Sequence, residues 1–156
     1  MLLGRKRVRR GATLIEGALV YPIVFLLMLG VILLGVAVFR YQQCSHIARE
    51  ASRWASCHGA RYARETGNPA ATPAAVYASA ILPQAAGMHG ANLGYSVSWS
   101  TSNEQTHTGT YVDPATSETK VISVFNTVSV TVTYTWNTGL FGTIPVSSTS
   151  TVTMQY

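Results

Sequence analysis

Residues 5–30, RKRVRRGATLIEGALVYPIVFLLMLG, decide the fold, because a basic cluster, one carboxylate and a long apolar run follow one another directly. The run from residue 17 to residue 39 contains 23 residues and no charged side chain. As an α-helix it would measure about 35 Å, enough to cross the roughly 30 Å hydrocarbon core of a bilayer. The stretch therefore predicts a membrane-spanning helix.

Two other interpretations of the apolar run fit less well. A buried helix in a soluble domain of this size rarely has apolar residues on every face. A cleaved secretory signal usually has an apolar region of about 7–15 residues, followed by a small-x-small cleavage site. Here the run is longer and continues into FRYQQC at residues 39–44, which offers neither such a site nor a good lipoprotein signal. We therefore expect the segment to stay on the mature chain.

The distribution of charge predicts an orientation. The formal net charge is +5, but five of the 11 basic residues lie within the first ten positions. From residue 12 onward, six basic residues face six acidic ones. Basic residues beside a membrane span hold their end in the cytoplasm, so we expect the chain after Arg40 to lie outside the inner membrane. Because that outer part is formally neutral, nucleic acid is not an expected partner. Membrane lipid is expected as a partner because of the apolar span.

Glu16 is the one charged side chain between Arg10 and Arg40. A carboxylate at the edge of the bilayer core is unfavourable unless it is paired, which makes Glu16 a functional candidate. Alone, it would fit equally well as an interfacial residue favoured by the macrodipole near a helix N-terminus. Its surroundings favour a function, because Gly11 lies five residues earlier, where the basic cluster meets the apolar run.

This arrangement resembles the processing site of type IV prepilins, in which a basic leader and a glycine precede the cleaved bond and a glutamate is the fifth mature residue. Residues 11–22, GATLIEGALVYP, further resemble the start of TadE-like proteins of the tight-adherence (Tad) pilus system, although Gly17 stands where many prepilins have an aromatic residue. Residues 128–136, VSVTVTYTW, and the Leu-Phe-Gly turn after them are similar more loosely. The matching N-terminal positions are Gly11, Glu16, Ala18, Leu19, Val20 and Pro22.

The resemblance implies a minor pilin, or pseudopilin, with a type IV pilin-like fold. Cleavage after Gly11 by a prepilin peptidase would leave 145 residues, more than the short major subunit of Tad pili has. The new ammonium group on Ala12 would pair with Glu16 of a neighbouring subunit, and Glu16 and Pro22 are the implied assembly residues. The implied partners are other pilin subunits, the peptidase and the inner-membrane pilus assembly machinery.

Beyond the membrane the helical pattern continues. Three arginines, at positions 49, 53 and 64, lie opposite an apolar stripe with a period of 3.6 residues. We expect one unbroken helix from about Ala12 to Glu65, ended by Gly67-Asn68-Pro69. The stripe comprises Tyr41, Cys44, Ile47, Ala48, Ala51, Trp54, Ala55, His58 and Tyr62.

The rest of the chain predicts a short helix and a sheet. Thr72-Pro73 is a helix-start signal, and the helix should run to near Pro83. The period then changes to two around residues 95–99, 127–136 and 149–156, where apolar residues alternate with Ser and Thr. Residues 137–145, NTGLFGTIP, should connect the last two strands. The fold class is therefore α+β: a long N-terminal helix packed on an antiparallel sheet of three or four strands, whose Thr-rich edges can add to a partner's sheet.

The chain offers little for chemistry. On one helix Cys44 and Cys57 would be about 20 Å apart, too far for a disulfide between them. Cys44 should therefore be a core residue, whereas Cys57 is free or bonded to another subunit. No metal, cofactor or enzyme activity is expected, because no motif with catalytic or metal-ligand spacing occurs. The four histidines, His46, His58, His89 and His107, are expected at surface or packing positions.

The sequence thus divides the chain into a basic leader (1–11), a transmembrane and assembly helix (12–39), an amphipathic stalk helix (40–66) and an extracytoplasmic domain (67–156). The function favoured is a minor pilin that takes part in assembling or priming a Tad pilus. The alternative is an uncleaved single-pass anchor whose outer domain binds a sugar or protein through Trp99 and Trp136. Those two tryptophans fit sheet core positions better.

Overall fold

The structure is a computed structural model that describes residues 10–139 and 142–156, with side chains described from residue 14 onward. The chain divides into two compact units, residues 1–38 and residues 39–156. Helix α1 (Arg10–Cys57) begins in the first unit and ends in the second. Most of the expected basic leader lies outside the described residues, as does part of the expected Leu-Phe-Gly turn.

In the first unit, α1 displays its apolar side chains. Large aliphatic and aromatic residues between positions 14 and 38 are exposed, among them Leu19, Phe25 and Leu34. By length and composition, the part of α1 from Leu14 onward can cross a membrane, and none of its most apolar 18-residue stretch is buried inside the protein. This is the composition that a helix in contact with lipid requires.

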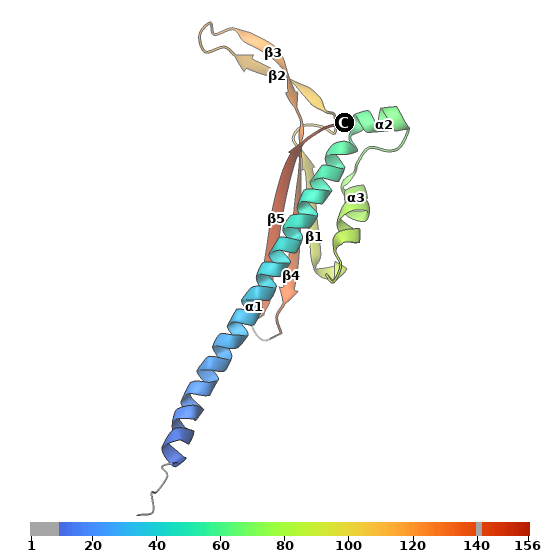
Figure 1. Cartoon of the computed structure of the whole chain (residues 1–156). Helices are drawn as coiled ribbons and strands as arrows, with labels where there is room; N and C mark the ends of the chain where they lie inside the picture. The colour runs from blue at the N-terminus through green and yellow to red at the C-terminus, as the bar shows by residue number, and fades with distance from the viewer. Residues whose placement is uncertain (1–9, 140–141) are drawn as a thin grey trace, which may run out of the picture. The chain divides into compact units, whose positions relative to one another are not determined.

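The second unit is built on a three-stranded antiparallel sheet (Figure 1). Its strands are β1 (Leu93–Trp99), β4 (Thr127–Asn137) and β5 (Thr143–Thr153), with β4 in the centre. Apolar residues of β4 face one side and its threonines and serines the other, which confirms the alternation read from the sequence. The connection between β4 and β5 is shorter than the predicted residues 137–145, because β4 ends at Asn137 and β5 already begins at Thr143.

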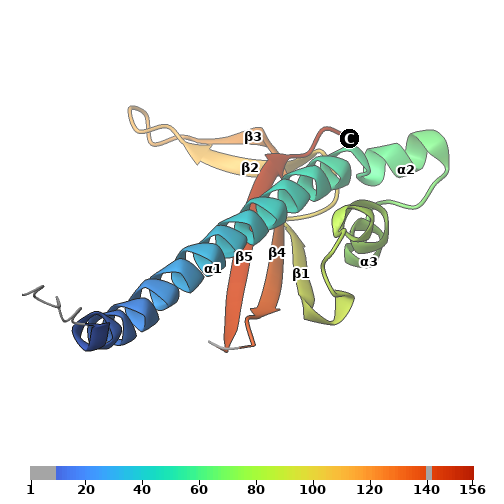
Figure 2. The same cartoon turned by 60° about the horizontal axis from the view of Figure 1, so that its bottom comes forward.

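Helices cover the apolar side of this sheet. Figure 2 shows α1 crossing β5 and β4, with α3 (Pro73–Val76) beside β1. The predicted α+β fold, a long helix on a small antiparallel sheet, is confirmed. Trp99 and Trp136 pack against the core, as expected for sheet positions. The fully or nearly buried core residues include Cys44, Ile47, Ala48, Ala51, Ala55, Val76, Ile81, Val128, Val130, Val132 and Met154.

The predicted unbroken helix to Glu65 is wrong, because α1 ends at Cys57 and a separate helix, α2, covers Ala60–Thr66. The end of the chain reaches this break: the main-chain N–H groups of Gln155 and Tyr156 both donate to the carbonyl oxygen of Ser56. A Cβ atom at Gly59 would lie 1.8 Å from the carbonyl oxygen of Tyr156. The close approach of the C-terminus therefore requires glycine at the break.

The short helix after Thr72 is irregular. The Thr72 hydroxyl accepts a hydrogen bond from the N–H of Ala75, which confirms the predicted start. After Val76 the chain continues as a π-helical turn, η1 (Tyr77–Ile81), and a 3₁₀ turn, η2 (Leu82–Gln84). A further 3₁₀ turn, η3 (Gly90–Asn92), leads into β1.

The sequence did not predict the hairpin formed by β2 (Thr106–Val112) and β3 (Thr119–Phe125), a two-stranded sheet inserted between β1 and β4. Figure 1 shows it extending away from the main sheet. Its base is held by the fully buried Asn126, whose side chain accepts from the Ser100 hydroxyl and donates to the Glu104 carbonyl oxygen, both at 2.9 Å. Strand β5 also ends earlier than expected, at Thr153.

Candidate functional site

Glu16 lies on the exposed surface of α1, in the first unit. Among the described side chains it has no ion-pair or hydrogen-bond partner. Gly11 and Ala12 belong to the first turns of the same helix. Four residues of α-helix advance by about 6 Å, so the main-chain nitrogen of Ala12 and the backbone of Glu16 are one turn apart. Within the part of the chain that the structure describes, the carboxylate therefore has no cation beside it.

The absence of a side chain at Gly17 leaves a hollow on the helix surface beside Glu16. Because Gly17 has no side chain, the ring of Tyr21 lies over its backbone, and a Cβ at Gly17 would be 3.0 Å from Tyr21 Cε2. Glu16, Gly17, Val20 and Tyr21 line a shallow hollow of about 330 Å³. In this hollow a carboxylate lies beside an aromatic ring, two groups that both attract cations.

Pro22 is accommodated inside α1 without ending it. Proline has no N–H group, so the carbonyl oxygen of Ala18 lacks its usual partner four residues later. Such an interruption is tolerated in membrane spans, where neighbouring groups can satisfy the freed carbonyl. The structure thus places Gly11, Ala12, Glu16 and Pro22 within four turns of one helix, as the sequence required.

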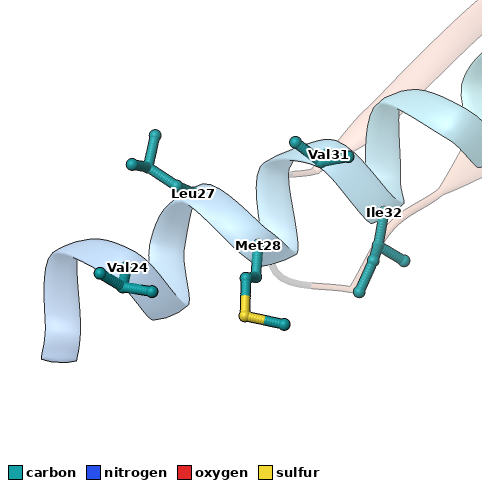
Figure 3. Close-up of a pocket in the computed structure, with 5 residues that line it drawn as sticks. All are labelled: Val24, Leu27, Met28, Val31 and Ile32. Carbon is teal, nitrogen blue, oxygen red and sulfur yellow. The ribbon is translucent and has the colours of Figure 1, made fainter.

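One turn further along, α1 carries a groove without polar atoms (Figure 3). Its volume is about 340 Å³, and its residues follow the i, i+3, i+4, i+7, i+8 spacing of one helix face. Such a face suits lipid chains or another apolar helix. The lining residues are Val24, Leu27, Met28, Val31 and Ile32.

Arg40 marks the start of the second unit, and its contacts were not foreseen. Its guanidinium carbon lies 5.6 Å from the centre of the Tyr134 ring, within cation–π range, and Nη1 donates to Gln43 Oε1 at 2.9 Å. Gln43 in turn donates to the carbonyl oxygen of Ala86 at 2.8 Å. These contacts hold the part of α1 that begins the second unit against the sheet and the turn after η2.

The two cysteines of α1 differ in environment. Both are free, Cys44 is fully buried and Cys57 is half-buried, so the predicted core position of Cys44 is confirmed. Burial raises the pKa of the Cys44 thiol, and the positive charge of Arg40 opposes this in part. Cys44 is consequently an unreactive core residue.

The histidines are not gathered into a site. His58 stacks on Trp54 with ring centres 4.0 Å apart, and its Nδ1 lies 2.7 Å from the carbonyl oxygen of Trp54. Within the described residues no group of three or more His, Cys, Asp or Glu side chains is placed to hold a metal ion. His58 is therefore a packing residue, in agreement with the expectation for that position.

Comparison with known proteins gives one match. Residues 11–53 match the family model described as TadE-like protein. The N-terminal segment of the chain is TadE-like. The match begins at the glycine singled out from the sequence and continues through the apolar span into the part of α1 that packs on the sheet, which confirms the resemblance and points to involvement with a Tad pilus. No curated protein and no solved structure matches the chain.

Proposed function

We propose that this protein is a TadE-like minor pilin, or pseudopilin, which a prepilin peptidase cleaves after Gly11 and which then takes part in assembling or priming a Tad pilus. The observation that carries the proposal is the exposed Glu16, which has no partner among the described residues and lies one turn from the future N-terminal residue Ala12 inside the TadE-like segment. The role is structural and not enzymatic.

The chemistry of pairing explains why cleavage and assembly belong together. Before cleavage, the nitrogen of Ala12 is an uncharged amide; afterwards it is an ammonium group. An ammonium and a carboxylate in a low-dielectric helix bundle attract strongly, and this attraction offsets the cost of removing the two charges from water. Pairing of Ala12 in one subunit with Glu16 in its neighbour would therefore fix the axial position of the two helices relative to each other. The apolar groove on α1 beyond Glu16 would supply surface for helix packing.

The proposed topology follows from the same segment. The basic residues before the span hold the N-terminus in the cytoplasm, and residues 39–156 lie outside the inner membrane. The partners are other pilin subunits, the peptidase, the inner-membrane assembly machinery and membrane lipid.

N-terminal sequencing of the protein from membranes with and without the peptidase tests the processing step. We expect the chain to begin at Ala12 when the peptidase is present and to retain its basic residues when it is absent. A Gly11→Val variant should stay uncleaved, whereas the matched Gly4→Val variant should be cleaved normally. If the native chain stays uncleaved in cells that process other prepilins, the processing step is refuted and the protein is a single-pass membrane anchor.

Substitution of Glu16 tests the assembly step. Glu16→Gln keeps the size of the side chain but removes its charge, and we expect it to insert, to be cleaved and to be lost from sheared surface filaments. Glu50→Gln, at an acidic position on the outer half of α1, is the matched control and should assemble normally. Normal recovery of the Glu16→Gln chain from filaments would refute the role of the carboxylate.

A further inference from the structure

The sheet of the second unit carries no charge. Its three strands, β1, β4 and β5, comprise 29 residues, and none of them is Asp, Glu, Lys or Arg. The charged residues of this unit lie instead on the helices, in the loop before β2 and on the β2–β3 hairpin. The edge strands of this sheet therefore lack the charged side chains that usually prevent an exposed strand from pairing with another chain.

The main-chain groups along both edges of this sheet lack partners outside the sheet among the described residues, although helix α3 lies beside β1 (Figure 2). Apart from their ladders with β4, residues 94–99 of β1 and 143–153 of β5 make no main-chain hydrogen bond to other described residues. Soluble proteins usually block such edges with lysine, proline, a bulge or a covering element, because an open edge is a template for another strand. Strand β5 has 11 residues and only Pro145, near its start, to hinder pairing.

The outward face next to the β5 edge is flat and hydroxyl-rich. Cross-strand pairs of Ser and Thr hydrogen-bond along it, with Thr131 and Thr149 at 2.8 Å and Ser129 and Thr151 at 3.0 Å. These short side chains fix the strands in register and leave the main chain of β5 accessible. An incoming strand would meet neither like charge nor bulk.

The strand directions indicate which strand of a second copy can pair with β5. Because β1 and β5 are each antiparallel to β4, they run parallel to each other at opposite edges of the sheet. A second copy of the chain in the same orientation can therefore place its β1 edge against β5 as a parallel pair. Antiparallel pairing of β5 with another β5 would turn the second copy around, so that its α1 would enter the unit from the opposite end.

We propose that β5 is an interaction surface for the β1 edge of a second copy in the same orientation, so that sheets of adjacent subunits join edge to edge. Such a contact is heterologous, and it repeats instead of closing on itself. The inference rests on the proposed pilin role, in which all subunits share one orientation because their N-terminal helices lie in one membrane or one fibre. It adds a second contact, outside the membrane, to the pairing of Ala12 with Glu16.

Cysteine cross-linking in membranes of cells that have the peptidase tests the proposal. Ser96 of β1 and Thr149 of β5 both pair with Thr131, so they lie at the same level on opposite edges. In a Cys57→Ser background, a chain with Ser96→Cys and a differently tagged chain with Thr149→Cys should form a mixed disulfide dimer on oxidation. Thr149→Cys alone should give no dimer.

Three outcomes would overturn the proposal. These are a Thr149→Cys homodimer, which indicates inverted copies; a link to a different protein only; and no link at all. Sequencing of the same sample separates the two proposals. A chain that begins at Ala12 without the link refutes edge pairing alone, whereas a linked chain that keeps its basic N-terminus refutes the processing.

Charge placed on the edge gives an independent test. Ser147→Lys with Thr151→Lys puts two lysines on β5, and we expect cross-linking to fall at least roughly fivefold, since charged side chains on an edge strand oppose the addition of another strand. The matched control, Thr133→Lys with Ser129→Lys, puts the same charges on the same face of the central strand, at the positions paired with those of β5. Equal loss in both variants would refute an edge contact. Circular dichroism shows that each variant is folded.

Discussion

The two halves of α1 use apolar residues in opposite ways. Between residues 14 and 38, large side chains such as Leu27 and Phe25 are 65% and 62% exposed. In the outer half the buried positions are mostly small, and Ala48, Ala51 and Ser52 are fully buried. The most hydrophobic part of this protein is therefore not its core. Large residues stand where lipid or another subunit must supply the contacts, and small ones stand where the sheet approaches the helix closely.

Enlarging one alanine in each half of α1 tests whether only the second half is tightly packed. We expect Ala51→Leu to lower the free energy of unfolding of residues 39–156 by about 3 kcal/mol, because a filled core has no space for added methylene groups. Ala18→Leu adds the same atoms to an exposed position and should change this free energy of unfolding by less than about 0.5 kcal/mol.

Urea unfolding of the full chain in detergent, followed by tryptophan fluorescence, measures this difference, since all three tryptophans pack against the core of the second unit. Equal effects of the two substitutions would show that the helix does not pack on the sheet as described.

The fully buried Asn126 of the second unit has hydrogen-bond partners inside that unit, whereas the exposed Glu16 has none among the described residues. We expect Asn126→Ala to cost about 2 kcal/mol, since it leaves the Ser100 hydroxyl and the Glu104 carbonyl oxygen without their partner. The hairpin should then become accessible to limited proteolysis. Asn92→Ala, at an exposed position, is the control and should alter neither stability nor cleavage. Protection of the hairpin in the Asn126→Ala chain would contradict the anchoring role.

The smallest expected effect concerns the two thiols. At neutral pH an aqueous maleimide should label Cys57 and leave Cys44 unlabelled in the folded chain, because the buried thiol is inaccessible and its pKa is raised. The folded state holds this proton more tightly than the unfolded state. The contribution of Cys44 to stability is therefore constant below the ordinary thiol pKa of 9.0 and decreases as the pH rises above it. Cys44→Ala should remove that alkaline decrease, and rapid labelling of Cys44 would contradict its burial.

The fold was predictable where one local rule sufficed. A run without charge predicts a long apolar helix, a period of two predicts strands, and Thr72-Pro73 predicts a helix start, and each of these elements is present. The candidate site was predictable for the same reason, since Gly11, Glu16 and Pro22 belong to one helix and their spacing along the chain is their spacing in space.

Prediction failed where distant segments meet. The break of α1 after Cys57 depends on the chain's last residues, which approach Gly59. The residues around position 59 do not predict that the end of the chain packs against them. The β2–β3 hairpin was missed because its strands, such as THTGTYV, mix Thr, Gly and Tyr without a clear apolar face. The packing of Arg40 on Tyr134 joins residues that are far apart in the chain.

The sequence alone determined the membrane helix, the position of its single acid and the alternating strands, because these follow from the chemistry of neighbouring residues. The tertiary structure alone decided which strand lies in the centre of the sheet, which edges stay open and where the helix ends. Those features depend on main-chain groups that find partners far along the chain, and hydrogen bonds of that kind leave almost no mark on the identity of the residues that make them.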